Sequence, residues 1–217
     1  LPNPYYVFVS EFMLQQTTVK TVVPRFKEFV SIWPNLKALS KINENRILEF
    51  WSGLGYYVRA KNLLKSSRII SKNFKNRIPK NYEDLISLPG VGDYTAKAIL
   101  GIGFNKPVMP IDTNIQRILR RIYGLKKLTT LNIKDLSILA EKYISKNQSS
   151  NLIQALMDYG SIICLPKKPK CNDCIIRNNS AEGEGGGIYS YGSDIYRIYD
   201  GGIAKLDNTL EIIPESR

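Results

Sequence analysis

Hydrophobic residues recur at helical spacing from the start of the chain to about residue 165. Two stripes illustrate the pattern, Phe26, Phe29, Val30 and Trp33 in one and Ala60, Leu63, Leu64 and Ile70 in the other. Such stripes form the buried face of an amphipathic helix. Strand-like alternation is scarce before residue 188. The pattern therefore predicts an all-α fold for this part of the chain.

Proline and glycine interrupt the helical pattern and predict where helices end. The expected breaks are Pro24, Pro34, Gly53 with Gly55, Pro79, the segment LPGVG at 88–92, Pro107 with Pro110, and Gly124. Helices of ordinary length remain between them, and no internal repeat is found. We expect a bundle of unlike helices.

The composition changes at residue 181. A glycine-rich acidic segment comes first, and two β-prone runs then flank Asp200, Gly201 and Gly202. Glycines between such runs favour a hairpin. We therefore expect residues 181–217 to be a separate appendage with a short β-hairpin.

Charge is spread unevenly along the 217 residues. The net charge is +12 at pH 7, with +16 on residues 1–180 and −4 on residues 181–217. A basic body predicts an acidic partner, and nucleic acid is favoured over a membrane because no basic amphipathic surface helix stands out. A solvated basic surface without function is the alternative. No signal peptide or membrane-spanning run is found, and Leu1 is interpreted as an internal start. The three cysteines argue against a disulfide scaffold and for a reducing compartment. We expect a cytoplasmic monomer, associated with the nucleoid if the source is bacterial.

Two local patterns suggest binding sites. In the segment 88–92, glycines allow a sharp turn before a helical pattern, and backbone N–H groups at such a turn attract phosphate. Taken alone, the segment also fits an ordinary turn between helices. Cys164, Cys171 and Cys174 form a C-x6-C-x2-C pattern typical of zinc or iron ligands, and the chain has no histidine. An oxygen ligand, solvent or nothing would fill the fourth place, and three free thiols are the alternative.

Five motifs occur in order along residues 1–180. They are VSEFMLQQT at 9–17, GLGYYVRAKNL at 53–63, LPGVGDYTAKAIL at 88–100, IDTNIQRILRR at 111–121, and ALMDYGSIIC with its cysteine loop at 155–174. In these motifs the chain resembles the helix-hairpin-helix DNA glycosylases, most closely the adenine DNA glycosylase (MutY) family. The resemblance implies two lobes with double-stranded DNA in the cleft between them. A helical barrel lobe would span 10–118, and residues 1–9 with 119–180 would form the lobe that holds the cysteine loop.

The resemblance also implies a reaction, the hydrolysis of the N-glycosidic bond of adenine mispaired with 8-oxoguanine or guanine. That reaction needs a proton for the leaving base and negative charge near the sugar. Glu11 is implied as the general acid and Asp112 as the carboxylate that stabilises the sugar cation. The apolar neighbours of Glu11 are expected to raise its pKa and keep it protonated. Asp112 also fits a helix N-cap, and both roles can coexist.

Position 94 separates two chemistries in the family. Members that also cut the strand, such as endonuclease III, have a lysine there that forms a Schiff base. This chain has Tyr94, and a phenol forms no imine, so the resemblance implies excision with water as the nucleophile. Plain packing of Tyr94 in its helix is compatible with this. Asn114 matches a family residue near the sugar.

Other residues are expected to bind DNA. Gln16 and Tyr56 match family positions that insert into the duplex once the target base has left the stack. Arg117 is a basic residue of the helix after Asp112. For Gln16 and Arg117 a solvated position is the alternative. The full predicted set is Gln16, Thr17, Leu54, Tyr56, Gly90, Val91, Gly92 and Arg117.

The chain departs from the family at two places. The family's cysteine run is C-x6-C-x2-C-x5-C and holds a 4Fe-4S cluster, whereas the last place here is Ser180. This predicts a weakened cluster and keeps open an inactive DNA-binding remnant. Thr113 stands where the family more often has glycine, which keeps open a glycosylase for thymine in G·T mispairs or for oxidised pyrimidines. Nothing after residue 180 resembles the family's C-terminal domain for oxidised guanine.

Overall fold

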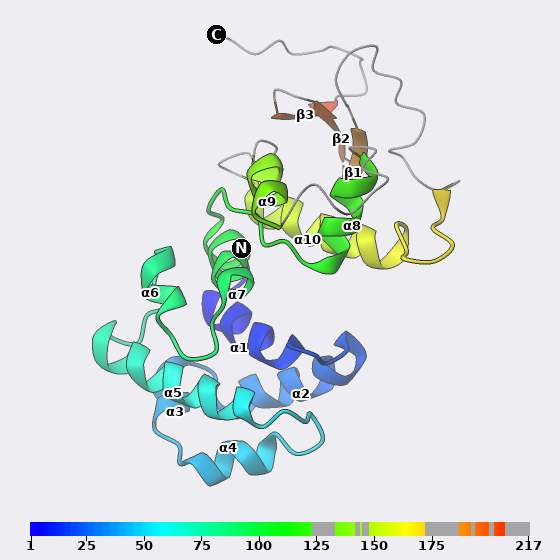
Figure 1. Cartoon of the computed structure of the whole chain (residues 1–217). Helices are drawn as coiled ribbons and strands as arrows, with labels where there is room; N and C mark the ends of the chain where they lie inside the picture. The colour runs from blue at the N-terminus through cyan, green and yellow to red at the C-terminus, as the bar shows by residue number, and fades with distance from the viewer. Residues whose placement is uncertain are drawn as a thin grey trace. The chain divides into compact units, whose positions relative to one another are not determined.

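The computed structural model describes residues 1–122, 133–141, 144 and 148–171, and the backbone of 187–191, 194–199 and 202–206. The chain divides into two compact units, Leu1–Phe104 and Asn105–Arg217 (Figure 1). This division falls before the boundary expected between 118 and 119, and it places residues 1–9 in the first unit. The two lobes implied by the resemblance stay a prediction.

The first unit is helical throughout its described secondary structure. Its elements are α1 (Pro4–Leu14), α2 (Val19–Ile32), α3 (Leu36–Ser40), α4 (Glu44–Phe50), α5 (Val58–Asn73), α6 (Tyr82–Ile86), α7 (Asp93–Ala98) and the π-helical turn η1 (Ile99–Gly103). Asparagine side chains cap α1, α3, α4 and α6 by accepting a backbone N–H of the first turn. Polar caps of this kind explain why the helices begin where they do.

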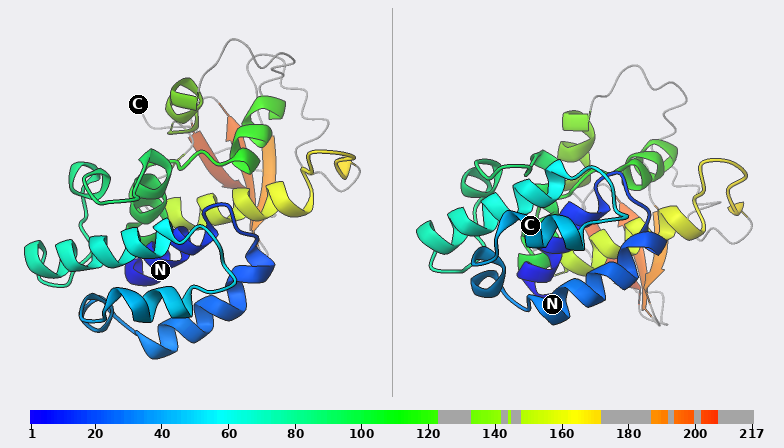
Figure 2. Two further views of the ribbon diagram at one scale, coloured as in Figure 1. Left: turned by 60° about the horizontal axis from the view of Figure 1, so that its bottom comes forward. Right: turned by 90° about the horizontal axis from the view of Figure 1, so that it is seen from below.

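The central helix of the first unit is α1. It contacts α2, α5, α7 and η1, and Phe8, Val9, Phe12 and Met13 on it have no exposed area. A helix that is hydrophobic on all sides is stable only inside a core. On the other side of α5 lie α3 and α4, as the views in Figure 2 also show. The core of the unit therefore surrounds α1.

One predicted stripe is fully confirmed and one predicted break is wrong. Ala60, Leu63, Leu64 and Ile70 of α5 are all buried. Pro24 lies inside α2 instead of ending a helix there. A proline inside a helix costs about 3 kcal/mol because it removes an N–H and crowds a carbonyl. Burial of Phe29 on α2 and of Trp33 at its C-cap contributes about 1.5–3 kcal/mol each, which offsets that cost.

The second unit contains α8 (Thr113–Ile122), α9 (Ile133–Glu141) and α10 (Ser149–Ile162), with α8 packed against both of the others. Its strands are β1 (Gly187–Tyr191), β2 (Asp194–Tyr199) and β3 (Gly202–Leu206). They pair antiparallel in the order β1-β2-β3, with Tyr189 opposite Tyr196 and Arg197 opposite Ala204. The β2 and β3 strands lie where the sequence predicts a hairpin, and residues 200 and 201 between them are outside the described residues. No described helix is long and apolar enough to cross a membrane.

Candidate active site

Glu11 lies in the last turn of α1 and is 7% exposed. Its neighbours Phe8 and Phe12 are fully buried and meet edge to face with ring centroids 5.1 Å apart. Glu11 is therefore buried beside aromatic residues of its own helix, and its role as general acid stays a prediction. The carboxyl group is held by a helix that is itself enclosed by other helices, so its position is set by the core.

The turn after α1 presents Gln16 to solvent. Gln16 is exposed and has a φ of 55°, a left-handed conformation that is uncommon outside glycine. Thr17 is half-buried, and its backbone N–H donates to the carbonyl of Leu14 at 3.1 Å. The side chain of Gln15 donates to the carbonyl of Gly90 at 3.2 Å. This bond joins the turn to the segment 88–92.

Two adjacent tyrosines are exposed in the loop between α4 and α5. Tyr56 and Tyr57 are 61% and 45% exposed, and Tyr56 has a φ of 49°. Gly53 and Gly55, at φ 87° and 68°, supply the left-handed turns that bring the tyrosines outward. Leu54, between Gly53 and Gly55, is buried at 6% exposure. Its expected contact with DNA stays a prediction.

The segment LPGVG forms the predicted turn between α6 and α7. Gly90 has a φ of 79°, and a Cβ built there would lie 2.8 Å from both Asn62 Cβ and Phe12 Cε1. Only glycine fits both the conformation and the space. Gly92 is the N-cap of α7, and Val91 between the glycines is buried. The turn is therefore closely packed against α1 and α5.

Asp93 links the two helices of this hairpin. Its Oδ1 accepts the Tyr82 hydroxyl at 2.9 Å and lies 3.3 Å from Lys97 Nζ. The hydrogen bond from Tyr82 to Asp93 raises the pKa of the Tyr82 phenol above its ordinary value.

The next residue, Tyr94, is half-buried in α7. No amine therefore stands at position 94.

Asp112 caps α8. Its Oδ1 accepts the N–H of Ile115 at 2.7 Å, and its backbone carbonyl accepts the N–H of Gln116 at 2.9 Å. The N-cap interpretation of Asp112 is confirmed. Since the side chain is half-buried and held at a helix N-terminus, the negative charge has a fixed place beside the positive end of the helix dipole.

Arg117 fastens α8 to the end of α10. Its guanidinium donates to the carbonyls of Cys164 and Gly160, both at 2.6 Å, and to Asn114 Oδ1 at 2.7 Å. Carbonyls at the end of a helix lack partners inside it, so a cation there satisfies them. The predicted phosphate contact of Arg117 stays a prediction, and Asn114 is oriented by the same guanidinium.

Gly160 allows α8 and α10 to approach each other at Asn114. A Cβ added to Gly160 would lie 2.5 Å from Asn114 Cβ and 3.1 Å from its Cγ. We expect Gly160→Ala to lower the free energy of unfolding by about 1–3 kcal/mol because the packed helices must separate. Urea denaturation of Gly160→Ala and of the unaltered protein measures this. A Gly160→Ala protein as stable as the unaltered one would contradict the packing.

The described part of the cysteine loop is tied to α8 as well. Arg121 donates to Cys164 Sγ at 3.1 Å and to the carbonyl of Leu165 at 2.9 Å. Cys164 is half-buried and Cys171 exposed, and neither is in a disulfide. Cys174 and Ser180 lie outside the described residues. Within the described part of the chain no three His, Cys, Asp or Glu side chains form a metal site.

The four family positions of the cysteine loop hold three thiols and one alcohol. A serine hydroxyl is a harder and less acidic donor than a cysteine thiol. The chain therefore does not supply the four thiolates of the family's cluster site.

The structure groups the predicted residues within each unit. In the first unit the turn at 15–17, the loop 53–57 and the hairpin 88–92 are joined by hydrogen bonds of Gln15 and Arg59. In the second unit Asn114, Arg117 and Cys164 form one network. Three residues of these networks, Arg59, Arg121 and Gly160, were not predicted from the sequence. Arg59 precedes Leu63 by four residues on the apolar stripe of α5, and a charged residue on such a stripe was the available signal.

A helical fold with a buried glutamate on its central helix α1 and a glycine hairpin between α6 and α7 packed against that helix fits a class of DNA repair glycosylases. The model of the HhH-GPD superfamily of base excision DNA repair proteins matches residues 9–142. The chain therefore belongs to the HhH-GPD superfamily.

Two relatives of known name to which the chain is similar are adenine DNA glycosylases. The chain is 42% identical over 180 residues to the adenine DNA glycosylase of Buchnera aphidicola subsp. Baizongia pistaciae, covering 81% of this chain and 50% of the relative. It is 34% identical over 177 residues to the human adenine DNA glycosylase, covering 80% of this chain and 32% of the relative. The chain thus spans half or less of the length of these relatives.

Solved structures share the fold. A thermostable thymine-DNA glycosylase superimposes with a TM-score of 0.71 at 30% identity, over 80% of this chain and 81% of that one. Endonuclease III in a non-covalent complex with DNA gives a TM-score of 0.70 at 20% identity, again over 80% and 81%. The second likeness shows the fold alone. The helical fold class predicted from the sequence is confirmed.

Proposed function

We propose that this chain is a monofunctional DNA glycosylase that hydrolyses the N-glycosidic bond of adenine mispaired with 8-oxoguanine or guanine. The observation that carries the proposal is the burial of Glu11 in the central helix of a chain whose curated relatives are adenine DNA glycosylases. In the proposed mechanism Glu11 carries its proton when the substrate binds, as a general acid must. A neutral carboxyl group is the form that can donate a proton.

In the proposed reaction, Glu11 donates its proton to the adenine ring. The bond between the sugar carbon and adenine breaks, and its electron pair leaves with the base. The sugar becomes an oxocarbenium-like cation, which the carboxylate of Asp112 stabilises. Water then adds to the sugar carbon and returns a proton to Glu11. In this reaction Glu11 transfers protons and Asp112 stabilises positive charge. The role of Glu11 depends on its burial, and that of Asp112 on its place at the N-terminus of α8.

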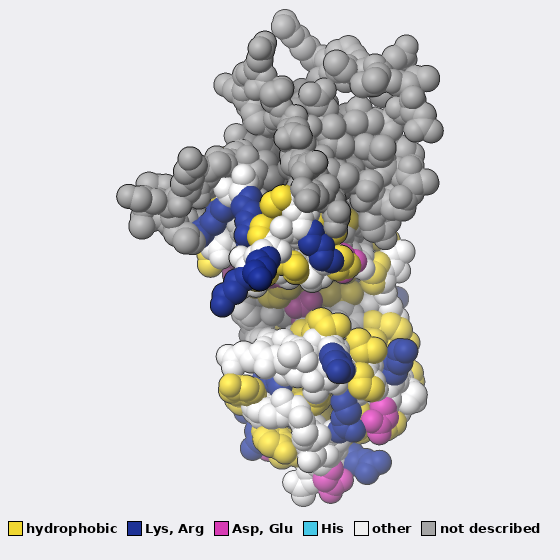
Figure 3. Space-filling model, turned by 90° about the vertical axis from the view of Figure 1, so that its right-hand side faces the viewer, with side chains coloured by type: hydrophobic (Ala, Val, Ile, Leu, Met, Phe, Trp, Pro, Cys, Tyr) yellow, Lys and Arg dark blue, Asp and Glu magenta, His cyan; other side chains and the backbone are white. Residues whose placement is uncertain are grey.

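DNA is the proposed partner. The net charge of +12 favours a polyanion, and dark-blue Lys and Arg side chains are more evident than magenta acidic ones on the described part of the face in Figure 3. The glycine turn at 88–92 offers backbone N–H groups for phosphate, while Gln16 and Tyr56 are exposed as insertion requires. The proposed substrate is duplex DNA, bound by a monomer.

Release of bases from a panel of defined duplexes tests the substrate. The panel contains A·8-oxoguanine, A·G, T·G and oxidised-pyrimidine pairs in one sequence context. We expect adenine to be released from the first two. Removal of thymine is a second candidate because the structure with a TM-score of 0.71 is a thymine-DNA glycosylase. Faster release of thymine than of adenine would favour that candidate and overturn the first.

Tyr94 predicts that the protein cuts no strand. We expect borohydride to trap no covalent adduct between the unaltered protein and its substrate duplex, because a phenol cannot form an imine. Tyr94→Lys should create a trappable adduct, detected as a slower band in denaturing electrophoresis, whereas Tyr94→Phe should not. Efficient trapping of the unaltered protein would contradict the monofunctional mechanism.

Ser180 predicts a labile cluster. We expect the purified chain to carry less iron than a full 4Fe-4S cluster would supply, and Ser180→Cys to increase the iron content, since a fourth thiolate restores a soft donor. Iron analysis and the visible absorption spectrum of anaerobically purified protein measure this, with Ser180→Ala as the control. A full cluster in the unaltered chain, unchanged by Ser180→Cys, would contradict it.

A further inference from the structure

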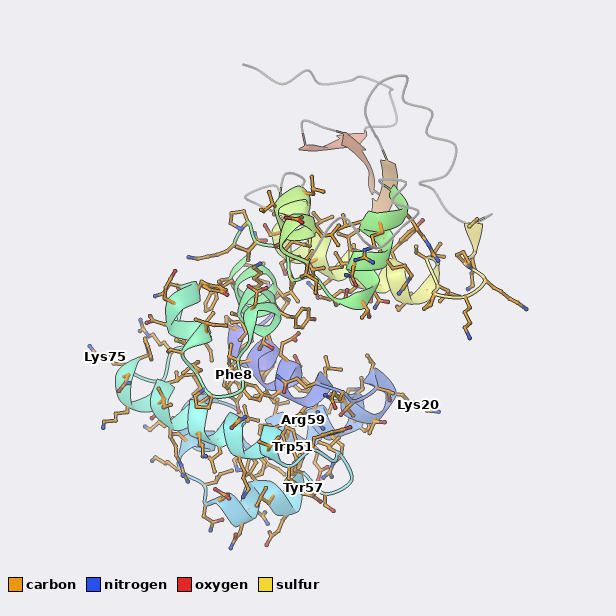
Figure 4. All side chains as sticks on the ribbon, viewed as in Figure 1. Phe8, Lys20, Trp51, Tyr57, Arg59 and Lys75 are labelled. Atoms are coloured by element: carbon orange, nitrogen blue, oxygen red, sulfur yellow. The ribbon has the colours of Figure 1, made fainter. Side chains whose placement is uncertain are left out.

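Arg59 is an arginine inside the protein. It is 4% exposed and lies on α5 next to the fully buried Trp51 (Figure 4), with its guanidinium carbon 5.5 Å from the centre of the indole. Burial lowers the pKa of Arg59, but a guanidinium remains charged in proteins. A buried cation needs acceptors for its N–H groups. The acceptors that it finds here are main-chain carbonyl oxygens.

Arg59 donates to carbonyls of two separate segments. One terminal nitrogen, Nη1, donates to residues at the end of α1, and the other, Nη2, donates to the loop before α5. The acceptors are the carbonyls of Phe12 at 3.2 Å, Met13 at 2.7 Å, Gln15 at 2.5 Å, Leu54 at 2.8 Å and Gly55 at 3.0 Å. The carbonyls at the end of α1 need partners from outside the helix, and a positive charge there is favourable. A single planar group thus joins the two segments.

Arg59 is one of the donors that hold the peptide groups before Gln16 and Tyr56. The Trp51 indole N–H also donates to the Gly55 carbonyl at 3.2 Å, and the Thr17 hydroxyl donates to the Gln15 carbonyl at 3.4 Å. The carbonyls of Gln15 and Gly55 both accept from the guanidinium, and each belongs to the peptide plane from which the φ of the next residue is measured. Gln16 and Tyr56 have φ values of 55° and 49°. Such values are sparsely populated for residues with a side chain and persist only where surrounding structure holds them.

Arg59 also lies beside one of the two exposed side chains. Its guanidinium carbon is 5.7 Å from the ring centre of Tyr56, within the range of a cation–π contact. Tyr56 is 61% exposed in spite of this contact. The Tyr56 ring thus contacts the cation and is still largely exposed to solvent.

We propose that Arg59 is a positioning residue that holds Gln16 and Tyr56 ready to enter the base stack together. The inference rests on the proposed function, in which these two side chains insert at the mispair. Ordering a side chain on binding costs conformational entropy. If Gln16 and Tyr56 are already ordered in the free protein, binding does not incur that cost. Lysine cannot replace Arg59, because a single ammonium group lacks the planar fork that reaches both segments.

Binding of two duplexes by Arg59→Lys tests the proposal. The duplexes share one sequence and differ only in an A·8-oxoguanine pair or an A·T pair. We expect Arg59→Lys to lose about five- to a hundredfold of the preference for the mispaired duplex, the cost of ordering two side chains on binding. Affinity for the paired duplex should change little, because phosphate contacts dominate it. A general loss of folded protein would weaken both duplexes alike and leave the preference unchanged.

Arg25→Lys is the matched control. Arg25 also donates to main-chain carbonyls, those of Phe50 and Ser52, and lies 4.3 Å from the Phe50 ring centre. None of its described bonds reaches residues 12–15 or 54–55, so the preference should be retained. Equal loss of preference in both variants, or no loss in Arg59→Lys, would overturn the proposal.

Hydrogen exchange separates this proposal from the proposed function. In Arg59→Lys without DNA, the backbone amides of 15–17 and 55–57 should exchange faster together, while Arg25→Lys should leave them as in the unaltered protein. Unchanged exchange in both segments overturns the positioning role even if adenine is excised. Faster exchange in both supports it even if the unaltered protein excises nothing, in which case only the proposed function fails.

Gly55→Ala decides the question if Arg59→Lys does not fold. The φ of 68° at Gly55 is unfavourable for alanine, while nothing lies within 4 Å of the added Cβ. The substitution therefore disturbs the peptide before Tyr56 and keeps the arginine. We expect loss of the preference for the mispaired duplex, and an unchanged preference would overturn the proposal.

Discussion

Glu11→Gln should abolish release of adenine while leaving binding to the A·8-oxoguanine duplex nearly unchanged. The amide keeps the shape of the carboxyl group but cannot supply a proton to the leaving base. Loss of a general acid lowers the rate by about a hundred- to ten-thousandfold. Single-turnover excision at saturating protein measures the chemical step, and a gel-shift titration of the same duplex measures the affinity.

The control for Glu11→Gln is Glu49→Gln. Glu49 is exposed on α4 and pairs with Arg46 at 3.7 Å, so the same chemical change there removes only a surface ion pair of small energetic value. Excision by Glu49→Gln should match the unaltered protein. Excision by Glu11→Gln within a few-fold of the unaltered protein would remove Glu11 from the role of general acid.

Asp112→Asn should lower the excision rate by at least about a hundredfold, as expected when a charge that stabilises a transition state is lost. Asparagine caps helices as well as aspartate does, so the bond to the Ile115 N–H and the stability of α8 should be kept. The substitution therefore separates the charge from the cap. Single-turnover kinetics and thermal denaturation of the same preparation measure the two effects.

Asp112→Ala and Asn43→Ala complete this comparison. Asp112→Ala loses the cap as well, which costs about 1 kcal/mol of stability. Asn43→Ala removes the cap of α4, where Oδ1 accepts the Arg46 N–H at 2.8 Å, and should cost similar stability without affecting the rate. If Asp112→Asn excised adenine as fast as the unaltered protein, Asp112 would be a cap and nothing more.

Much of the fold could be predicted from local pattern. The stripe on α5, the glycine turn at 88–92 and the N-cap at Asp112 each depend on residues close in sequence, and helical spacing or capping chemistry identifies such features directly. Pro24 was misread because the cost of a proline alone is not decisive, whereas the predicted stripe of Phe29 and Trp33 on the same segment is buried and compensates for that cost.

The long-range hydrogen bonds of Arg59 and Arg117 could not be predicted from local sequence pattern. Arg59 reaches carbonyls 44 to 47 positions earlier in the chain, and Arg117 reaches Gly160 and Cys164, 43 and 47 positions later. Main-chain carbonyls are present at every residue, so the sequence does not indicate which of them an arginine will find. The contact of Gly160 with Asn114 also cannot be predicted before the packing of α8 against α10 is known.

Chromatographic detection of free adenine from a duplex with one A·8-oxoguanine pair tests the central claim most directly. The unaltered chain, incubated in excess over the duplex, should release one adenine per duplex and leave the strand intact until alkali is added. The matched A·T duplex should release none. Absence of free adenine from the mispaired duplex, with the protein folded and bound to it, would contradict the assignment of this chain as an adenine glycosylase.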